Sequence, residues 1–333
     1  MKNILFLLTI LIFSSVAIAQ NQENSILQRN YEFKMISSGD NRPDFNIRKD
    51  SMNFLLIYLH EGKSLAEFKN DTKLSDETID QSVILLKNKN WLHEIDGQLK
   101  PTVFIATAKD GKELYCFAEP VASQIAEEAR KSLSEIKAEF AKTKMSQKFD
   151  FQHWSFFILS NVLLDNGNIF NMENLFFKRA DGSQYKRPLR HGKNYYASIL
   201  ENTNKNSEAF EIYGNQLLKS THSLQVDVYG NNRYADNRYQ NLSSSENRIT
   251  AKDTKILSKI AQIFLPKLLN VLENNRSYAE EVYKKTGYSQ EITFEEFFIW
   301  WYHFIYSQAT NDMQNMGLLT VPSSGNFDYE IDL

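Results

Sequence analysis

Residues 64–114, SLAEFKNDTKLSDETIDQSVILLKNKNWLHEIDGQLKPTVFIATAKDGKEL, carry the most regular pattern in the chain. Apolar residues at helical spacing predict a short helix after position 64 and a longer one that Ser75 caps and that ends near Asn90. The Asp-Gly pair at 96–97 is typical of a two-residue hairpin turn, and a β-rich run follows at 102–105. The stretch therefore predicts two helices followed by a β-hairpin.

An apolar helix at 52–59 is predicted just before this stretch. Three helices followed by a hairpin resemble the winged helix-turn-helix domains of MarR- and ArsR-type transcription regulators, over about residues 50–118. The resemblance implies a recognition helix at 74–90 and a wing at 92–107. It indicates a fold rather than a function, because one fold can carry many activities.

The charges of the implied recognition helix do not favour DNA binding. Its first turn carries Asp76 and Glu77, and Lys87 and Lys89 come only near its end. A helix that enters the major groove needs base-reading side chains and cationic neighbours for the phosphates. We therefore disfavour nucleic acid as a partner and interpret the domain as a scaffold for packing or for protein contact.

The first 19 residues have the pattern of a secretory signal peptide. Lys2 gives a cationic start, an apolar run follows, and Ala-Ile-Ala at 17–19 is a small-residue cleavage site. No other apolar stretch approaches the roughly 20 residues that a membrane helix needs. We expect a periplasmic or secreted protein with no transmembrane span in its mature chain.

Composition and apolar spacing predict a two-domain protein of mainly α class with small β. The 333 residues are 42% hydrophobic and 13% aromatic, and the formal net charge of −3 gives no general attraction to polyanions. We predict a signal peptide at 1–19, an N-terminal extension at 20–49, a winged-helix-like domain with a long helix at 50–145, and a mainly helical, aromatic-rich domain at 146–333. In regulators of the resembling type such a long helix supports dimerisation, so the resemblance allows a homodimer.

The second half is expected to contain one strand among its helices. Alternation predicts this strand at 224–228, and helical spacing resumes from Lys252. Thr293 and Glu296 match a capping box at the start of the last helix. The tail from Val321 is interpreted as irregular and acidic.

The segment 178–196 is strongly basic, with six Lys or Arg residues against one Asp, and it also holds tyrosines. Basic groups hold carboxylate or phosphate, and tyrosine rings stack on ligand rings. The predicted ligand-binding residues are Arg187, Arg190, His191, Lys193, Tyr195 and Tyr196. The alternative is a solvated hairpin about Asp181-Gly182 whose charges pair with acids elsewhere.

Three histidines are candidate catalytic residues, namely His153, His191 and His303. Glu296, Trp300 and His303 share one face of the last predicted helix, so an acid and an imidazole could act there only with partners outside the helix. A histidine hydrogen-bonded within a crowded core is the alternative for His153. An exported hydrolase would need two of these histidines beside an acid in one pocket.

The chain lacks HExxH, paired CxxC, G-x-S-x-G, P-loop and GxGxxG motifs, so we predict no metal site and no cofactor. Cys116 is the only cysteine, and we expect it to be buried. The favoured interpretation is an exported binding or interaction protein whose partner is a protein, a peptide or an anionic ligand. The alternatives are an exported hydrolase, or a DNA-binding regulator if the N-terminus is not a signal peptide.

Overall fold

A computed structural model describes residues 25–165, 168–178, 182–183, 185–202, 210, 212–230, 246–322 and 326–333. The fold is mainly α with small β-sheets, which confirms the predicted class. The predicted signal peptide at 1–19 lies outside the described residues.

An N-terminal lobe contains three short helices and a hairpin where the sequence predicts them: α1 (Met52–His60), α2 (Leu65–Thr72), α3 (Asp76–Asn88), β2 (Leu92–Ile95) and β3 (Gln98–Pro101). Ser64 and Ser75 cap α2 and α3 by accepting hydrogen bonds from main-chain N–H groups of the first turn. Asp96 and Gly97 turn the hairpin with φ of 51° and 75°, which this residue pair tolerates. The winged-helix interpretation rests on this order of elements and stays a prediction.

A small apolar cluster fills this lobe. It includes Leu55, Leu56, Phe68 and Trp91, all fully buried. Single 3-10 turns flank or connect the main elements at η1 (Ile26–Gln28), η2 (Lys49–Ser51) and η4 (Tyr288–Gln290).

A three-stranded sheet joins the lobe to the rest of the molecule. Its strands are β1 (Tyr31–Ile36), β7 (Tyr196–Glu201) and β4 (Phe104–Ala106), in the order β1-β7-β4, with β1 antiparallel and β4 parallel to β7. We assigned no strand within the extension at 20–49, and β1 is a correction to that assignment. We placed residues 104–106 in the wing, but they pair with β7 instead, because sheet pairing depends on partners far along the chain.

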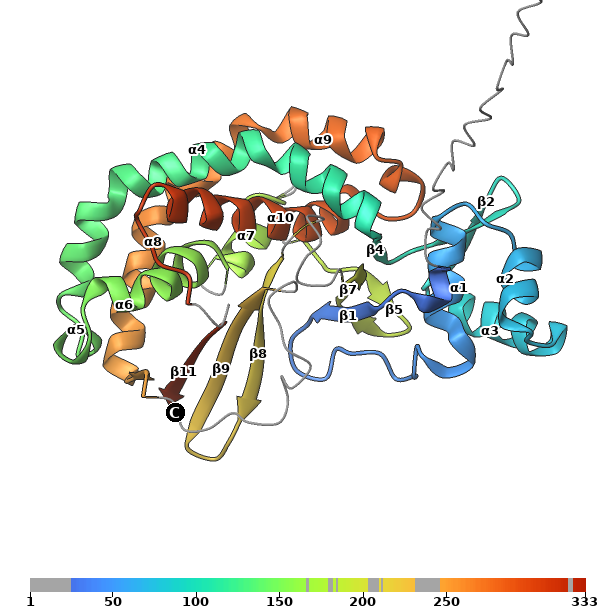
Figure 1. The fold of residues 1–333 in the computed structure, drawn as a ribbon, viewed down its shortest axis with the longest axis horizontal. Coiled ribbons are helices and arrows are strands. Elements are labelled where there is room, and N and C mark those ends of the chain that lie inside the picture. The colour runs from blue at the N-terminus through green and yellow to red at the C-terminus, as the bar shows by residue number, and fades with distance from the viewer. Residues whose placement is uncertain are drawn as a thin grey trace, which may run out of the picture.

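The long helix α4 (Ala108–Phe140) packs against α8 (Ala251–Asn274) and α10 (Phe294–Asn315), with α9 (Arg276–Lys285) alongside (Figure 1). Thr107 caps α4 and Asp110 closes the capping box. Its buried stripe belongs to the larger apolar cluster, so the division that we drew at residue 145 does not coincide with the division between the two clusters.

A π-helical turn interrupts the helix that begins at Phe151. The helix begins as α6 (Phe151–Phe156) and continues as the π-turn η3 (Phe157–Val162). The short helices α5 (Met145–Lys148) and α7 (Ile169–Leu175) lie on either side of this segment in the chain.

A second sheet has four strands in the order β10-β11-β9-β8: β8 (Tyr213–Lys219), β9 (Ser223–Gly230), β10 (Arg248–Ile249) and β11 (Asn326–Asp332). β9 confirms the strand predicted at 224–228. The prediction of an irregular tail from Val321 was wrong, because β11 is an inner strand of this sheet. Phe327 and Tyr329 are buried and alternate with acidic residues, as in a strand with one apolar face.

A small hairpin joins β5 (Leu189–Arg190) to β6 (Lys193–Asn194). Cys116 is exposed, contrary to expectation, because it lies off the buried stripe that contains Leu114 and Ala118. Among the described residues, no helix is both long and apolar enough to cross a membrane.

Candidate functional site

Arg190, one of the predicted ligand-binding residues, is buried within the protein. Its guanidinium donates to the main-chain carbonyls of Tyr195 and Thr102 and to both carboxylate oxygens of Glu296, at 2.7 and 2.8 Å. Burial raises the pKa of Glu296, and the positive charge of Arg190 opposes that shift. Thr293 caps α10, but Glu296 points to Arg190 rather than completing the predicted capping box. Arg190 thus joins β5 to the start of α10.

The other residues of the basic segment do not form one ligand surface. Arg187 makes a bidentate ion pair with Glu173, with nitrogen–oxygen distances of 2.8 and 2.6 Å. Tyr195 accepts a hydrogen bond from the indole of Trp91, and Tyr196 is fully buried. The remaining two residues lie on a hairpin that turns at His191-Gly192: His191 is exposed there with φ of 48°, and Lys193 is half-buried. The alternative hairpin about Asp181-Gly182 includes Asp181, which lies outside the described residues.

A cavity of about 670 Å³ adjoins this segment. Arg187 and Arg190 line it together with Glu291, Glu295 and Glu296. The carboxylates offset the basic groups, and both guanidiniums already pair with a carboxylate, although Arg190 Nε itself has no hydrogen-bond partner in the described part of the chain. This balance gives no specific attraction for an anion.

The three candidate histidines lie apart. His153 stacks on Phe149 at 4.1 Å between ring centroids and bonds the Asn247 side chain. His191 lies on the hairpin turn, and His303 lies on α10 in a different cavity. Among the described residues, no cluster of three or more His, Cys, Asp and Glu side chains is arranged to hold a metal ion.

A fourth histidine, His60, makes the contacts that the candidates lack. Its Nδ1 lies 2.8 Å from Glu291 and its Nε2 lies 3.1 Å from Asp110. Burial alone would lower the pKa of His60, but the Glu291 and Asp110 carboxylates outweigh it and raise the pKa to about 10. His60 is the last residue of α1, and both of its partners lie far along the chain. His60 belongs to the lobe, whereas Asp110 and Glu291 belong to the larger body, so these two contacts connect the lobe to the body.

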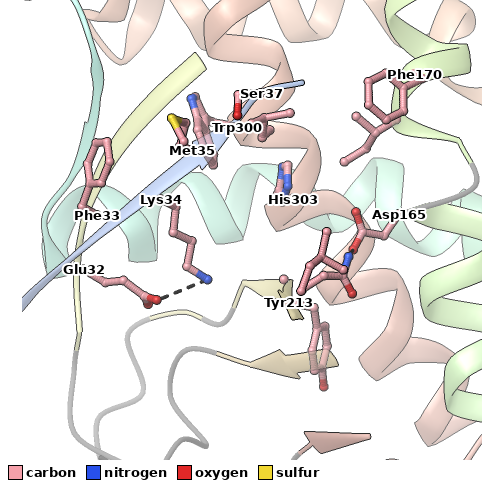
Figure 2. A pocket seen from close by; sticks show the side chains of 15 residues that line it. Glu32, Phe33, Lys34, Met35, Ser37, Asp165, Phe170, Tyr213, Trp300 and His303 are labelled. Carbon is pink, nitrogen blue, oxygen red and sulfur yellow. Dashed lines mark hydrogen bonds and ion pairs between the residues drawn. The ribbon is translucent and has the colours of Figure 1, made fainter. Parts of the chain in front are cut away.

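A second cavity, of about 510 Å³, lies between β1, α10 and β8, and we call it the β1–α10 cavity (Figure 2). This volume is in the range of ordinary small-molecule sites. Its lining combines apolar side chains with a group of polar ones: Glu32, Lys34, Asp165, Trp300 and His303.

β1 directs charged side chains into this cavity because side chains alternate along a strand. Phe33 and Met35 pack against the smaller apolar cluster, whereas Ile36 packs against the larger one. Glu32 and Lys34 share the face of Ile36, and their charged groups lie 3.8 Å apart. Figure 2 shows Lys34 extending from β1 beside Glu32.

α10 presents a hydrogen-bond donor and an acceptor to the same cavity. Trp300 and His303 are 1% and 6% exposed, and their ring centroids lie 5.3 Å apart. His303 Nδ1 lies 2.7 Å from the Ile299 carbonyl, which assigns the proton to Nδ1 and leaves Nε2 as an acceptor. Burial lowers the pKa of His303 to about 4, so the ring is neutral at pH 7. Among the described residues, neither Trp300 Nε1 nor His303 Nε2 has a hydrogen-bond partner.

Asp165 lies on the cavity wall within an amide network. Its carboxyl accepts hydrogen bonds from Asn215 at 2.5 Å and from Asn161 at 3.4 Å. Burial raises the pKa of Asp165 to about 7, although the Asn215 bond and the charge of Lys34 oppose the shift. Asn161 belongs to the π-turn η3, a type of distortion that recurs at functional sites.

Only part of this cavity was predicted from the sequence. Trp300 and His303 were predicted to share one helix face, but Glu32, Lys34 and Asp165 were not predicted as site residues. The available signal was the run YEFKMI at 31–36, in which Glu and Lys alternate with apolar residues as in a strand with an inward charged face.

No family model, curated protein or solved structure matches this chain. Function therefore has to be inferred from the chemistry of the cavity.

Proposed function

We propose that this protein is an exported binding protein that captures its ligand in the β1–α10 cavity. The unpartnered Trp300 donor and His303 acceptor on the cavity wall support this proposal. Among the described residues the Trp300 indole N–H is a buried donor without a partner, which costs about 1–3 kcal/mol, so a ligand that accepts from it recovers that cost on binding. The winged-helix-like lobe serves as a scaffold that supports β1 through the three-stranded sheet.

The charges of the cavity favour a neutral ligand group over an anion. The Lys34 ammonium already faces the Glu32 carboxylate and also acts on Asp165 and His303. His303 is neutral, so the unmet capacity is one donor and one acceptor. An amide supplies both complements, and an apolar portion of the ligand can contact Ile169 and Phe170 on the same wall. Of the predicted ligand classes, a peptide-like one fits better than an anionic one.

The hydrolase and regulator alternatives have less support. A hydrolase was expected to place two of the candidate histidines beside an acid, whereas His153, His191 and His303 lie apart. The exposed first turn of α3 carries Asp76 and Glu77, which repel phosphate.

Thermal-shift measurements with a panel of N-acetylated amino-acid methylamides test the binding proposal. Trp300→Phe removes the indole N–H and keeps a ring, and Trp154→Phe is the matched control. The Trp154 indole is also buried and unpartnered, but it packs away from the cavity among Phe157 and Phe327. We expect an amide-bearing compound to stabilise the wild type and the control, with binding about fivefold weaker in Trp300→Phe. No stabilisation by any compound, or an equal effect in all three proteins, would count against the proposal.

Mass spectrometry of the native polypeptide tests the proposed export. A processed chain that begins at Gln20 is the expected result. A cytosolic chain that retains Met1 would remove the main argument against a DNA-binding regulator.

A further inference from the structure

The β1–α10 cavity lies between two strands that each end a sheet. Within the part of the chain that the structure describes, β1 is the outer strand of the order β1-β7-β4, and β8 is the outer strand of the order β10-β11-β9-β8. The cavity is lined by the run 32–37 of β1 and by Tyr213, Gly214, Asn215 and Leu217 of β8. An outer strand offers main-chain groups to any chain that can lie beside it.

The register shows which main-chain groups of β1 point outward. Asn202 N–H donates to Asn30 O, and this pair continues the β1–β7 register by one step. Hydrogen-bonded and non-bonded pairs alternate in an antiparallel ladder. Residues 32, 34 and 36 therefore bond β7, and the N–H and C=O groups of Phe33 and Met35 point away from it, toward the open edge.

The register of β8 likewise shows which of its main-chain groups point outward. Ser220 N–H donates to Ser223 O, so the even-numbered residues of β8 bond β9 and the odd-numbered ones point away. Tyr213 confirms this, because its N–H donates to Ser307 Oγ and its carbonyl accepts from the Tyr306 hydroxyl, both on α10. The main-chain groups of Asn215 and Leu217 are thus also directed outward on the cavity side.

We propose that the ligand is an extended peptide segment of a partner protein, which adds a strand to the open edge of β1 and places an Asn or Gln side chain in the β1–α10 cavity. This inference rests on the proposed function and names its substrate class. Main-chain bonds to Phe33 and Met35 supply affinity, and the side chain that enters the cavity supplies selectivity. An amide side chain donates to His303 Nε2 and accepts from Trp300 Nε1. A charged side chain is disfavoured, because Lys34 and Glu32 already face each other.

Fluorescence anisotropy with a blocked, labelled heptapeptide of alternating Thr and Val with one central Gln tests this inference. Only alternate residues of an added strand bond the edge. N-methylation of one alternate set of peptide nitrogens should therefore weaken binding at least tenfold, and N-methylation of the other set should change it less than threefold. Replacing the central Gln by Glu, Lys or Leu should weaken binding about fivefold or more.

Variants of the protein supply the matched arm of the test. Met35→Pro removes an N–H that points away from β7, and an outer strand tolerates such a proline. Met35→Ala removes the side chain but keeps the N–H. We expect at least tenfold weaker peptide binding in Met35→Pro than in Met35→Ala, with unchanged circular dichroism. Trp300→Phe should weaken peptide binding about fivefold, and Trp154→Phe should leave it unchanged.

Three outcomes would overturn the inference. Equal effects of the two N-methylated sets, or equal binding by the two Met35 variants, would exclude strand addition. If N-acetylglutamine methylamide still stabilises the protein through Trp300 in that case, the binding proposal stands and only the peptide is wrong. If neither the heptapeptide nor the methylamide binds, both proposals fail and the inward charges of β1 serve to protect its edge.

Discussion

Two regions of α10 differ in whether their buried polar side chains have hydrogen-bond partners. At its start, Glu296 is 2% exposed and both of its carboxylate oxygens accept from Arg190. One to two turns later, Trp300 and His303 are also buried, at 1% and 6% exposed, yet an indole N–H and an imidazole nitrogen have no partner among the described residues.

This difference separates groups that hold the fold from groups that are available to a ligand. A complete set of internal hydrogen bonds leaves a side chain nothing to offer a ligand, whatever its charge. A buried donor or acceptor without a partner lowers stability, so one that lines a cavity gains from a ligand that satisfies it. The basic residues of the sequence indicated the Arg190 region as the ligand site, whereas the unpartnered polar atoms of the structure indicate the β1–α10 cavity.

The largest expected effect breaks the satisfied region. Arg190→Ala leaves the buried Glu296 carboxylate without its cation, and breaking a buried pair in this way costs about 3–5 kcal/mol of unfolding free energy. Urea denaturation measures the loss. The double variant Arg190→Met/Glu296→Leu removes both charges and should recover most of the stability.

A different result for Arg190 would reverse the comparison. If Arg190→Ala unfolded with the wild-type midpoint and slope but lost heptapeptide binding, the basic segment would regain its predicted role as a ligand surface. The cavity on α10 would then lose its claim as the binding site.

His60 gives the next largest effect, and pH reveals it. The pKa of His60 is raised from 6.5 to about 10 in the folded state, so its stabilisation is fully present below pH 6.5 and is lost as pH rises through 10. The difference in unfolding free energy between wild type and His60→Gln should be about 2–3 kcal/mol at pH 6 and should shrink toward pH 10. A difference that does not change across this range would mean that the charge of His60 is not what joins the lobe to the body.

Asp165 tests the unsatisfied region with a smaller effect. Its folded pKa is raised to about 7, so the carboxyl favours the folded state below pH 4 and loses that contribution as pH rises through 7. His303 has the opposite slope, because its folded pKa is lowered to about 4 and its contribution is lost as pH falls from 6.5. Stability of wild type relative to Asp165→Asn should therefore fall by about 1–2 kcal/mol between pH 4 and pH 8. Chemical denaturation at each pH measures it, and a rise in this difference would contradict the assignment.

The sequence predicted the elements whose signals are local. Capping by Ser75 and the turn at 96–97 were visible because each depends on neighbouring residues, and the structure confirms both. β1 and β11 were missed because a strand is stabilised by partners far along the chain. The local sequence of neither segment identifies its partner strand.

The candidate site shows the same limit. Arg190 was interpreted from residue type, but its role comes from Glu296, which lies 106 positions away. The partners of His60, Glu291 and Asp110, lie 231 and 50 positions away from it. Trp300 and His303 could be placed on one face because i,i+3 spacing is local. That both lack partners could be seen only once the neighbouring strands were in place.

The smallest expected effect concerns the part of the basic segment that remains accessible. His191→Asn/Lys193→Gln removes an imidazole and an ammonium from the β5–β6 hairpin, and Asn tolerates the positive φ that His191 adopts. Unfolding free energy should change by less than about 0.5 kcal/mol, as for most surface substitutions. Heptapeptide affinity by anisotropy should stay within twofold of wild type, because neither residue lines the β1–α10 cavity. A clear loss of affinity with unchanged stability would place the ligand on the hairpin. The hairpin side chains would then supply the binding energy that is proposed to come from the unpartnered groups of α10.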